Sequence, residues 1–147
     1  MSFTSNEQNK LIVKEYIEKV LNTGETSSIS EYIGQNYVEI YNGKKYELGI
    51  DGAKTHIIGV RNTYPDLKLV INNQICEGEW VATSYTMTGT QMGEWLGIKP
   101  TNKKIKVTGV NINRIVDGKI VEHGGAANLL EPLLKAEAIR IVSNEEK

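Results

Sequence analysis

Residues 88–101 read T-G-T-Q-M-G-E-W-L-G-I-K-P-T and residues 117–130 read D-G-K-I-V-E-H-G-G-A-A-N-L-L, and these two stretches frame the part of the chain that decides the fold. Between them, residues 105–115 alternate apolar and polar side chains, which predicts a β-strand. Asp117-Gly118 supplies the positive φ angles of a tight hairpin turn, so we expect another strand over residues 119–123. Strands linked in this way pair in an antiparallel sheet.

The same alternation precedes the framed region. Residues 67–72 and residues 80–90 each repeat with a period of two, which predicts two earlier strands of the sheet. Residues 37–41 form a further short strand, closed by Asn42-Gly43. The strands beyond residue 67 follow one another closely, as expected for an antiparallel sheet built from hairpins.

Three helices are expected before the main sheet. Ser5-Asn6-Glu7-Gln8 forms a capping box, and apolar residues then recur at helical spacing until Gly24. Residues 28–31 predict a second, shorter helix. Asp51 is expected to cap a third helix, which Pro65 ends because the residue before a proline is disfavoured in the helical region.

A last helix is expected after the sheet, where four leucines form an apolar stripe and Pro132 is acceptable in the first turn. Helices that must bury their apolar faces, together with a late antiparallel sheet, predict an α+β fold in which helices pack on one face of a curved sheet. A chain of 147 residues suits one domain, and we assign residues 1–147 to it.

Composition excludes several classes of function. Seventeen basic residues nearly balance eighteen acidic ones, so nucleic acid is not an expected partner. The one basic cluster, Lys99, Lys103, Lys104 and Lys106, lacks interleaved aromatic residues and is interpreted as a solvated face. No apolar stretch approaches membrane-spanning length and the first residues do not resemble a signal peptide, so we expect a cytoplasmic protein with no membrane partner.

Cys76 is the only cysteine, which excludes an internal disulfide and a cysteine-based zinc site. The two histidines, His56 and His123, have no second ligand-type residue at metal spacing, so no metal site is expected. His56 is interpreted as a surface residue near the start of the third helix.

The order of elements resembles that of nuclear-transport-factor-2-like cone folds. Three motifs are more specific: Tyr64-Pro65-Asp66-Leu67, the Gly89–Thr101 region with its Gly93-Glu94-Trp95-Leu96-Gly97-Ile98, and Asp117-Gly118-Lys119-Ile120-Val121-Glu122-His123. Together they resemble the SnoaL-like polyketide cyclases, and the resemblance covers nearly the whole chain. It implies a cone-like sheet and a pocket in which polyketide esters close a ring by an intramolecular aldol reaction.

Such a reaction needs a base, an acid and an apolar pocket, with no metal or other cofactor. The resemblance implies an Asp just after the histidine of the last strand and a His on the preceding strand, where this chain has Gly125 and Asn111. Gln91 replaces a His after Gly-Thr, Gly124 replaces a Trp, and Asn128 stands where a further Asp is common. Glycine and amide side chains do not exchange protons at neutral pH, so the family mechanism does not carry over intact.

His123 is the remaining catalytic candidate, because an imidazole exchanges protons near neutrality and small residues follow it. The alternative is a hydrogen-bonded strand histidine. Glu122 points the opposite way in a regular strand, so the two should not act as a pair.

Asn111 and Asn113 share an inward face with Ile105 and Val107, and oriented amides there suggest a ligand, with buried water or backbone as alternative partners. Further candidate ligand-binding residues are Tyr16, Tyr41, Tyr85, Met87, Gln91 and Trp95, for which ordinary core packing is the alternative.

Our leading hypothesis is a SnoaL-like protein that binds an apolar, carbonyl-bearing small molecule and acts as a cyclase or isomerase. The alternatives are a non-catalytic carrier or sensor, and a dimeric interaction module. In each case we expect a homodimer through the outward sheet face, on which we place Thr86, Thr88, Lys106, Thr108 and Ile112.

Overall fold

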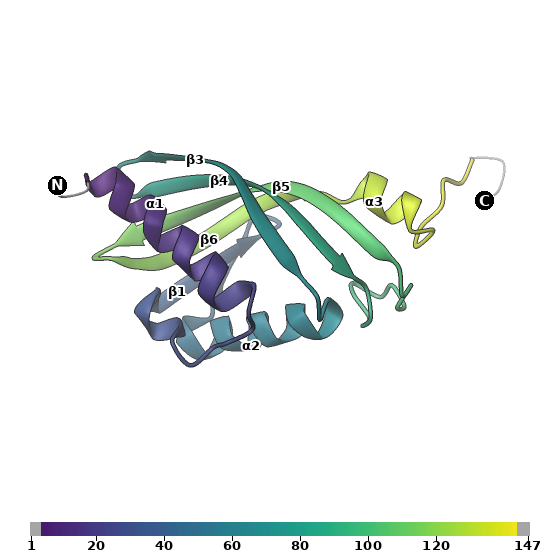
Figure 1. Ribbon diagram of the computed structural model, residues 1–147, viewed down its shortest axis with the longest axis horizontal. Helices are drawn as coiled ribbons and strands as arrows, with labels where there is room; N and C mark the ends of the chain where they lie inside the picture. Colours follow the sequence, from purple (N-terminus) through teal and green to yellow (C-terminus); the bar gives the residue numbers. More distant parts are fainter. Residues whose placement is uncertain (1–3, 144–147) are drawn as a thin grey trace.

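The computed structural model describes residues 4–143 of the chain (Figure 1). Its helices are α1 (Ser5–Tyr16), which continues into the π-helical turn η1 (Ile17–Leu21), the 3-10 helix η2 (Ile29–Glu31), α2 (Gly49–Thr63) and α3 (Leu130–Lys135). Its strands are β1 (Ile33–Tyr41), β2 (Lys44–Glu47), β3 (Lys68–Glu77), β4 (Trp80–Thr90), β5 (Lys104–Val116) and β6 (Lys119–Asn128). None of the helices described is long and apolar enough to cross a membrane.

The strands form one sheet in the order β2-β1-β6-β5-β4-β3. The predicted antiparallel pairing of the four late strands is confirmed, and β1 also pairs antiparallel with β2. β1 and β6 run parallel to each other, which was not predicted. This pairing joins strands far apart in the sequence, and local periodicity does not tell which distant strands become neighbours.

Four strands differ from the prediction: β1 begins at Ile33 and not at residue 37, β3 runs on to Glu77, β2 was not predicted, and β6 is longer. Asn42-Gly43 does more than close β1, since both residues have positive φ (53° and 77°) and turn the chain into β2. All four residues of β2 are exposed, so they carry no alternating signal. β6 continues past residue 123 to Asn128. This part was not predicted, because its glycines and alanines have a weak preference for strands.

Helix boundaries also needed correction. Thr4, and not Ser5, caps α1: its hydroxyl accepts a hydrogen bond from the Glu7 amide, and the Glu7 carboxylate accepts one from the Thr4 amide. Asp51 lies inside the first turn of α2 and does not cap it. The predicted end of this helix before Pro65 is confirmed, as is a proline in the first turn of α3.

α1 and α2 lie on the same side of the curved sheet, while α3 lies beyond the end of β6 (Figure 1). Apolar residues of α1, η1, α2 and the inner sheet face form the main core. On β5, Ile105, Val107 and Asn113 are buried while Lys106 and Ile112 on the other face are exposed, which confirms the predicted inward face. The inner face therefore carries both the core and the side chains of the candidate site.

Candidate functional site

A cavity of about 930 Å³ opens between the inner sheet face, α2 and the β1–β2 hairpin. It is lined by Glu39, Ile40, Tyr41, Asn42, Tyr46, Leu48, His56, Tyr85, Asn111, His123, Gly124, Gly125, Ala126, Ala127 and Leu129. Both histidines of the chain are among these residues. Apart from the histidines, Glu39, Asn42 and Asn111, the lining is apolar, aromatic or small, as is typical of pockets for small molecules.

The pairing of the strands places Glu39 and His123 side by side. Glu39 on β1 lies beside His123 on β6, and His123 lies beside Asn113 on β5, so the three side chains form a row across the sheet. Residues directly opposite each other point to the same face, and here that face is the inner one. The row brings together a carboxylate, an imidazole and an amide from three strands.

Glu39 is held by His56 of α2. The His56 Nδ1–H donates to both carboxylate oxygens, at 2.8 Å to Oε2 and more closely to Oε1. The Glu39 side chain is only 11 % exposed and that of His56 is 50 % exposed. A buried carboxylate needs such a partner, and the hydrogen bond to Glu39 raises the pKa of His56, more than burial lowers it.

The pKa of His123 is shifted in the opposite direction. Its Nδ1 hydrogen-bonds Oδ1 of the buried Asn113 at 2.7 Å, so Nδ1 carries the proton. Burial lowers the pKa of His123, an effect opposed by Glu39 and reinforced by His56. His123 is therefore an imidazole whose lone pair lies on Nε2, and within residues 4–143 no protein hydrogen bond uses that nitrogen.

Two imidazoles with pKa values shifted in opposite directions thus border one cavity. One is suited to accept a proton and the other to donate one, and environments that separate two pKa values in this way mark acid and base roles. Glu122 has the outward position expected for it, opposite Arg114 and away from the cavity.

Two tyrosines pack behind Glu39. Burial is the main reason that the pKa values of Tyr16 and Tyr37 are raised, and the Glu39 charge adds to it in both. Tyr16 does not line the cavity; its ring packs against Tyr32 with a centroid distance of 6.3 Å. These phenols therefore stay protonated, and both belong to the core beside the carboxylate.

Three of the candidate ligand-binding residues line the cavity: Tyr41, Tyr85 and Asn111. Tyr41 is 60 % exposed and stands at the open side. Tyr85 is buried, and its hydroxyl lies only 2.5 Å from where a Cβ on Gly109 would be, so the glycine leaves room for the ring. Asn113 contributes indirectly, through His123.

The other candidates lie elsewhere. The Gln91 amide donates to the carbonyls of Gly93, Ile98 and Lys99 and accepts from the Thr101 hydroxyl, so it holds the loop over residues 91–103. Trp95 packs edge-on against Tyr64 at 6.4 Å. Met87 packs between the two apolar clusters. None of these three lines the cavity.

Sequence reasoning missed Glu39. It interpreted His56 as a surface residue, and the side chain is indeed half exposed, but its contact with Glu39 and its place at the cavity were not foreseen. A signal for both was present. Glu39 alternates with Tyr37 and Tyr41 on the inner face of β1. His56 lies three residues after the buried Ala53 and four before Val60, which places it on the inward stripe of α2.

A model of the family described as "SnoaL-like polyketide cyclase" matches residues 11–135. This chain belongs to that family. It is also 35 % identical over 107 residues to the nogalonic acid methyl ester cyclase of Streptomyces nogalater, covering 69 % of this chain and 78 % of the cyclase.

Solved structures share the fold. AclR from Streptomyces galilaeus, described as a candidate hydroxylase, superposes with a TM-score of 0.78 at 25 % identity, covering 96 % of this chain and 92 % of AclR. A SnoaL-like protein from Jannaschia sp. CCS1 gives a TM-score of 0.81 at 22 % identity, covering 96 % of this chain and 99 % of its own. The SnoaL-like architecture is therefore established for this chain, while its reaction depends on the residues in the cavity.

The position at which SnoaL-like cyclases are expected to carry their Asp is closed to any side chain. Gly125 has φ +151°, and a Cβ there would lie 2.3 Å from the Val110 carbonyl oxygen and 2.9 Å from the Asn111 Cα. Both contacts are to backbone of the neighbouring strand, which cannot move away cheaply. The local backbone is therefore built around a glycine, and the ionisable groups Glu39, His56 and His123 that border the cavity come from β1, α2 and β6.

Within the described residues, no group of three or more His, Cys, Asp or Glu side chains is placed to hold a metal ion.

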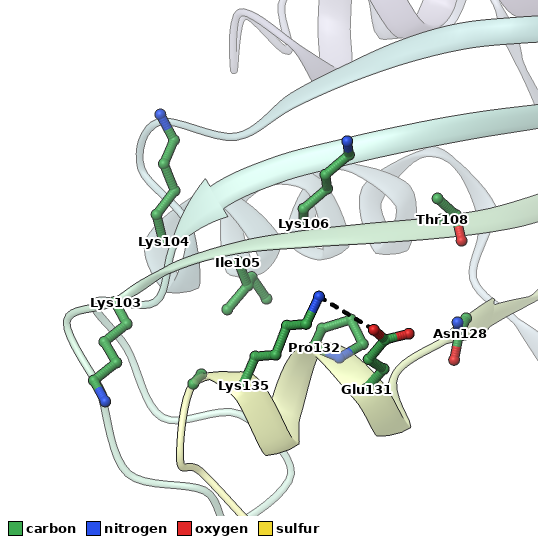
Figure 2. A pocket seen from close by; sticks show the side chains of 10 residues that line it. Lys103, Lys104, Ile105, Lys106, Thr108, Asn128, Glu131, Pro132 and Lys135 are labelled. Atoms are coloured by element: carbon green, nitrogen blue, oxygen red, sulfur yellow. Dashed lines mark ion pairs between the residues drawn. The ribbon is translucent and has the colours of Figure 1, made fainter.

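A second, smaller cavity of about 350 Å³ lies between β5 and α3 (Figure 2). It is bordered by lysines, of which Lys135 pairs with Glu131 at 3.1 Å, and it contains neither histidine. The larger cavity is the candidate active site.

Proposed function

We propose that this SnoaL-like protein catalyses proton transfer next to a carbonyl group, as in aldol ring closure or keto–enol isomerisation, with His123 as base and His56 as acid. The observation that carries the proposal is that both imidazoles border one cavity and each is held through Nδ1 by a buried acceptor, Asn113 Oδ1 or the Glu39 carboxylate. Each ring is thereby left with Nε2 for a ligand.

The first step would use the lone pair of His123. Nε2 removes a proton from a carbon flanked by a carbonyl, and the electron pair of the C–H bond moves into the enolate. Asn111 and Tyr85 line the same cavity and can donate hydrogen bonds to the enolate oxygen. Burial raises the pKa of Tyr85, so its hydroxyl keeps the proton needed to donate.

The second step would use the proton of His56. The enolate carbon attacks a second carbonyl of the same molecule, and the new alkoxide takes a proton from Nε2 of the imidazolium. Glu39 stabilises the charged form of His56 before the transfer and fixes the ring in place. The product has the same atoms as the substrate, and His123 returns its proton to His56 through water.

The lining favours an uncharged substrate. No lysine or arginine is among the residues that border the cavity, while Glu39 brings a negative charge. The proposed His56 imidazolium is already paired with Glu39, so a free carboxylate would enter without a cation of its own, whereas an ester would not require one. This agrees with the methyl ester named for the Streptomyces nogalater relative. Tyr41, Tyr46 and Tyr85 provide flat surfaces for an apolar ring system.

Thermal unfolding against a panel of polyketide esters and their matched free acids tests the substrate class. A ligand at about 100 times its dissociation constant should stabilise the native state by about 2.7 kcal/mol. We expect esters to raise the midpoint and the free acids to have little effect. Free acids that bind as well as their esters would overturn the proposal of an uncharged substrate.

Turnover of a stabilising ester tests the catalytic roles. We expect His123→Ala and His56→Ala each to lower kcat by about 100-fold or more, the usual contribution of a positioned acid or base. Asn113→Ala should act through His123 and change the pH profile. A His123→Ala protein with unchanged kcat would remove His123 from the mechanism.

One observation favours the alternative of a carrier without catalysis, namely the glycine that occupies the position expected for the family's Asp. Such a protein would bind an ester and leave it unchanged. Product analysis after incubation with a stabilising ester separates the two functions.

A further inference from the structure

The larger cavity opens along β6, in the direction from His123 toward the end of the strand. Residues 119–124 of this strand are buried or half-buried, whereas residues 125–128 are exposed. On the neighbouring strand β1, Glu39 lies beside His123, and Tyr41, two residues further on, is 60 % exposed. The imidazole therefore lies deep in the cavity, and the part of a ligand that does not react would extend from it toward the open side.

Two positions of β6 follow His123 on the inner face of the sheet. Alternate residues of a strand share a face, so Gly125 and Ala127 point the same way as the histidine. The pairing with β5 agrees, since Gly125 lies opposite Asn111 and Ala127 lies opposite Gly109. Both positions border the cavity. Ala127 is four residues from His123, a separation of about 14 Å at 3.4 Å per residue in a strand.

Only the second of these positions can hold a larger side chain. A Cβ at residue 125 would lie 2.3 Å from a backbone oxygen of β5, so the fold itself keeps the space beside His123 free. Ala127 already has a Cβ and is exposed, so a longer side chain could extend from it over the inner face. Ala127 is thus the first residue of β6 beyond His123 whose size can change the length of the free space.

Aromatic rings border the same cavity from the β1–β2 hairpin. Tyr46 lies opposite Glu39 in the pairing of β1 with β2, so it points to the inner face, as does Tyr41. Both rings are exposed and line the cavity. The open part of the cavity therefore offers flat aromatic surface on one pair of strands and a strand with almost no side chains next to it, which suits an elongated planar ligand.

We propose that Ala127 determines the length of the ligand that the cavity accepts. Its methyl group leaves room for a planar ester that extends about 14 Å along β6 from His123. A larger side chain at this position would fill the far part of that space and leave the part beside Gly125 unchanged. This inference rests on the proposed function, because it concerns the cavity that is proposed to bind an ester.

Binding of a short and a long aromatic ester to Ala127→Leu tests this role. Methyl benzoate has one ring, and methyl anthracene-2-carboxylate has three fused rings in a line. Neither has a second carbonyl group, so no ring closure occurs and binding is measured alone. Calorimetric titration should find that Ala127→Leu binds the three-ring ester about tenfold or more weakly than the natural protein does, while the affinity for methyl benzoate stays within about twofold.

Asn128→Leu is the matched control, because it adds the same side chain at the next residue of β6. Asn128 is exposed, points to the other face of the sheet and does not border the larger cavity. Both esters should bind to this variant as they bind to the natural protein. Circular dichroism checks that each variant is folded. In NMR spectra of the natural protein, the three-ring ester should shift the amide signal of Ala127, and methyl benzoate should leave it unchanged.

The outcomes separate this inference from the proposed function. A natural protein that binds neither ester would contradict both. If the natural protein binds both esters, and Ala127→Leu weakens neither of them or weakens both equally, the role of Ala127 is overturned and the ester-binding cavity is retained. Equal losses in Ala127→Leu and Asn128→Leu would also overturn that role, because residue 128 lies outside the larger cavity.

Discussion

At the scale of single residues, two hydrogen bonds in the candidate site determine which ring nitrogen of each histidine is available to a ligand. Asn113 and Glu39 both bind an Nδ1, yet one partner is a neutral amide and the other a carboxylate. The buried neutral environment lowers the pKa of His123, whereas the carboxylate raises that of His56. Two chemically identical side chains thereby become suited to opposite roles.

The sequence indicated only part of this site. His123 and Asn113 were identified because a titratable and an amide side chain share the inward face of predicted strands. Glu39 was missed because its neighbour His123 lies on a strand distant in the sequence, and no local pattern predicts a parallel pairing. The sequence also suggested Gln91 as a ligand-binding amide. Its side chain instead donates to carbonyls of its own loop and does not line the cavity.

Gly125 provides a prediction at this scale. Gly125→Ala should lower the free energy of unfolding by about 1–3 kcal/mol, because the new Cβ meets backbone atoms and the backbone conformation suits glycine. Gly124→Ala is the control: its Cβ would lie 3.4 Å from the Ile40 Cβ, an ordinary contact. Urea denaturation of both variants measures the difference. Equal costs would show that the strand adapts to a side chain at residue 125.

At the scale of elements, Arg61 joins three parts of the chain. Its guanidinium donates to the carbonyls of Leu21 and Asn22 at the end of η1, and to those of Pro65 and Leu67 just before β3. Arg61 itself belongs to α2, so one side chain fixes the helix against both segments. A planar group with five donors can do this, while a lysine ammonium cannot reach all four carbonyls.

Arg61→Lys should therefore lower the free energy of unfolding by about 1–3 kcal/mol, as expected when several partly buried carbonyls lose a partner. Arg114→Lys makes the same replacement in an exposed ion pair with Glu79 and should cost no more than about 0.5 kcal/mol. Chemical denaturation compares the two. Similar losses for both variants would mean that the Arg61 hydrogen bonds contribute little.

The loop over residues 91–103 gives a second prediction for an element. Gln91→Glu replaces an amide donor by a carboxylate facing three carbonyl oxygens, and should destabilise this loop. Hydrogen exchange of its amides should become faster, while binding of an ester in the cavity stays unchanged. Gln35→Glu, at an exposed position, is the control. Loss of ester binding in Gln91→Glu alone would show that the loop contributes to the pocket.

At the scale of the whole molecule, the two faces of the sheet have separate tasks. The inner face holds the core and the cavity, and the outer face carries exposed side chains such as Val70 and Val110. Sequence periodicity predicted this division, because it assigns alternate residues to opposite faces. It did not predict the sheet order, in which the parallel β1–β6 pair brings Glu39 beside His123.

The most direct test of the acid–base pair is an NMR titration of the two histidine rings in the natural protein. His56 should titrate above the ordinary histidine pKa of about 6.5 and His123 below it. Glu39→Gln should bring the His56 value down, because the raising hydrogen bond to a carboxylate is lost. If both rings titrate together near the ordinary value, or if His123 has the higher pKa, the assignment of base and acid is contradicted.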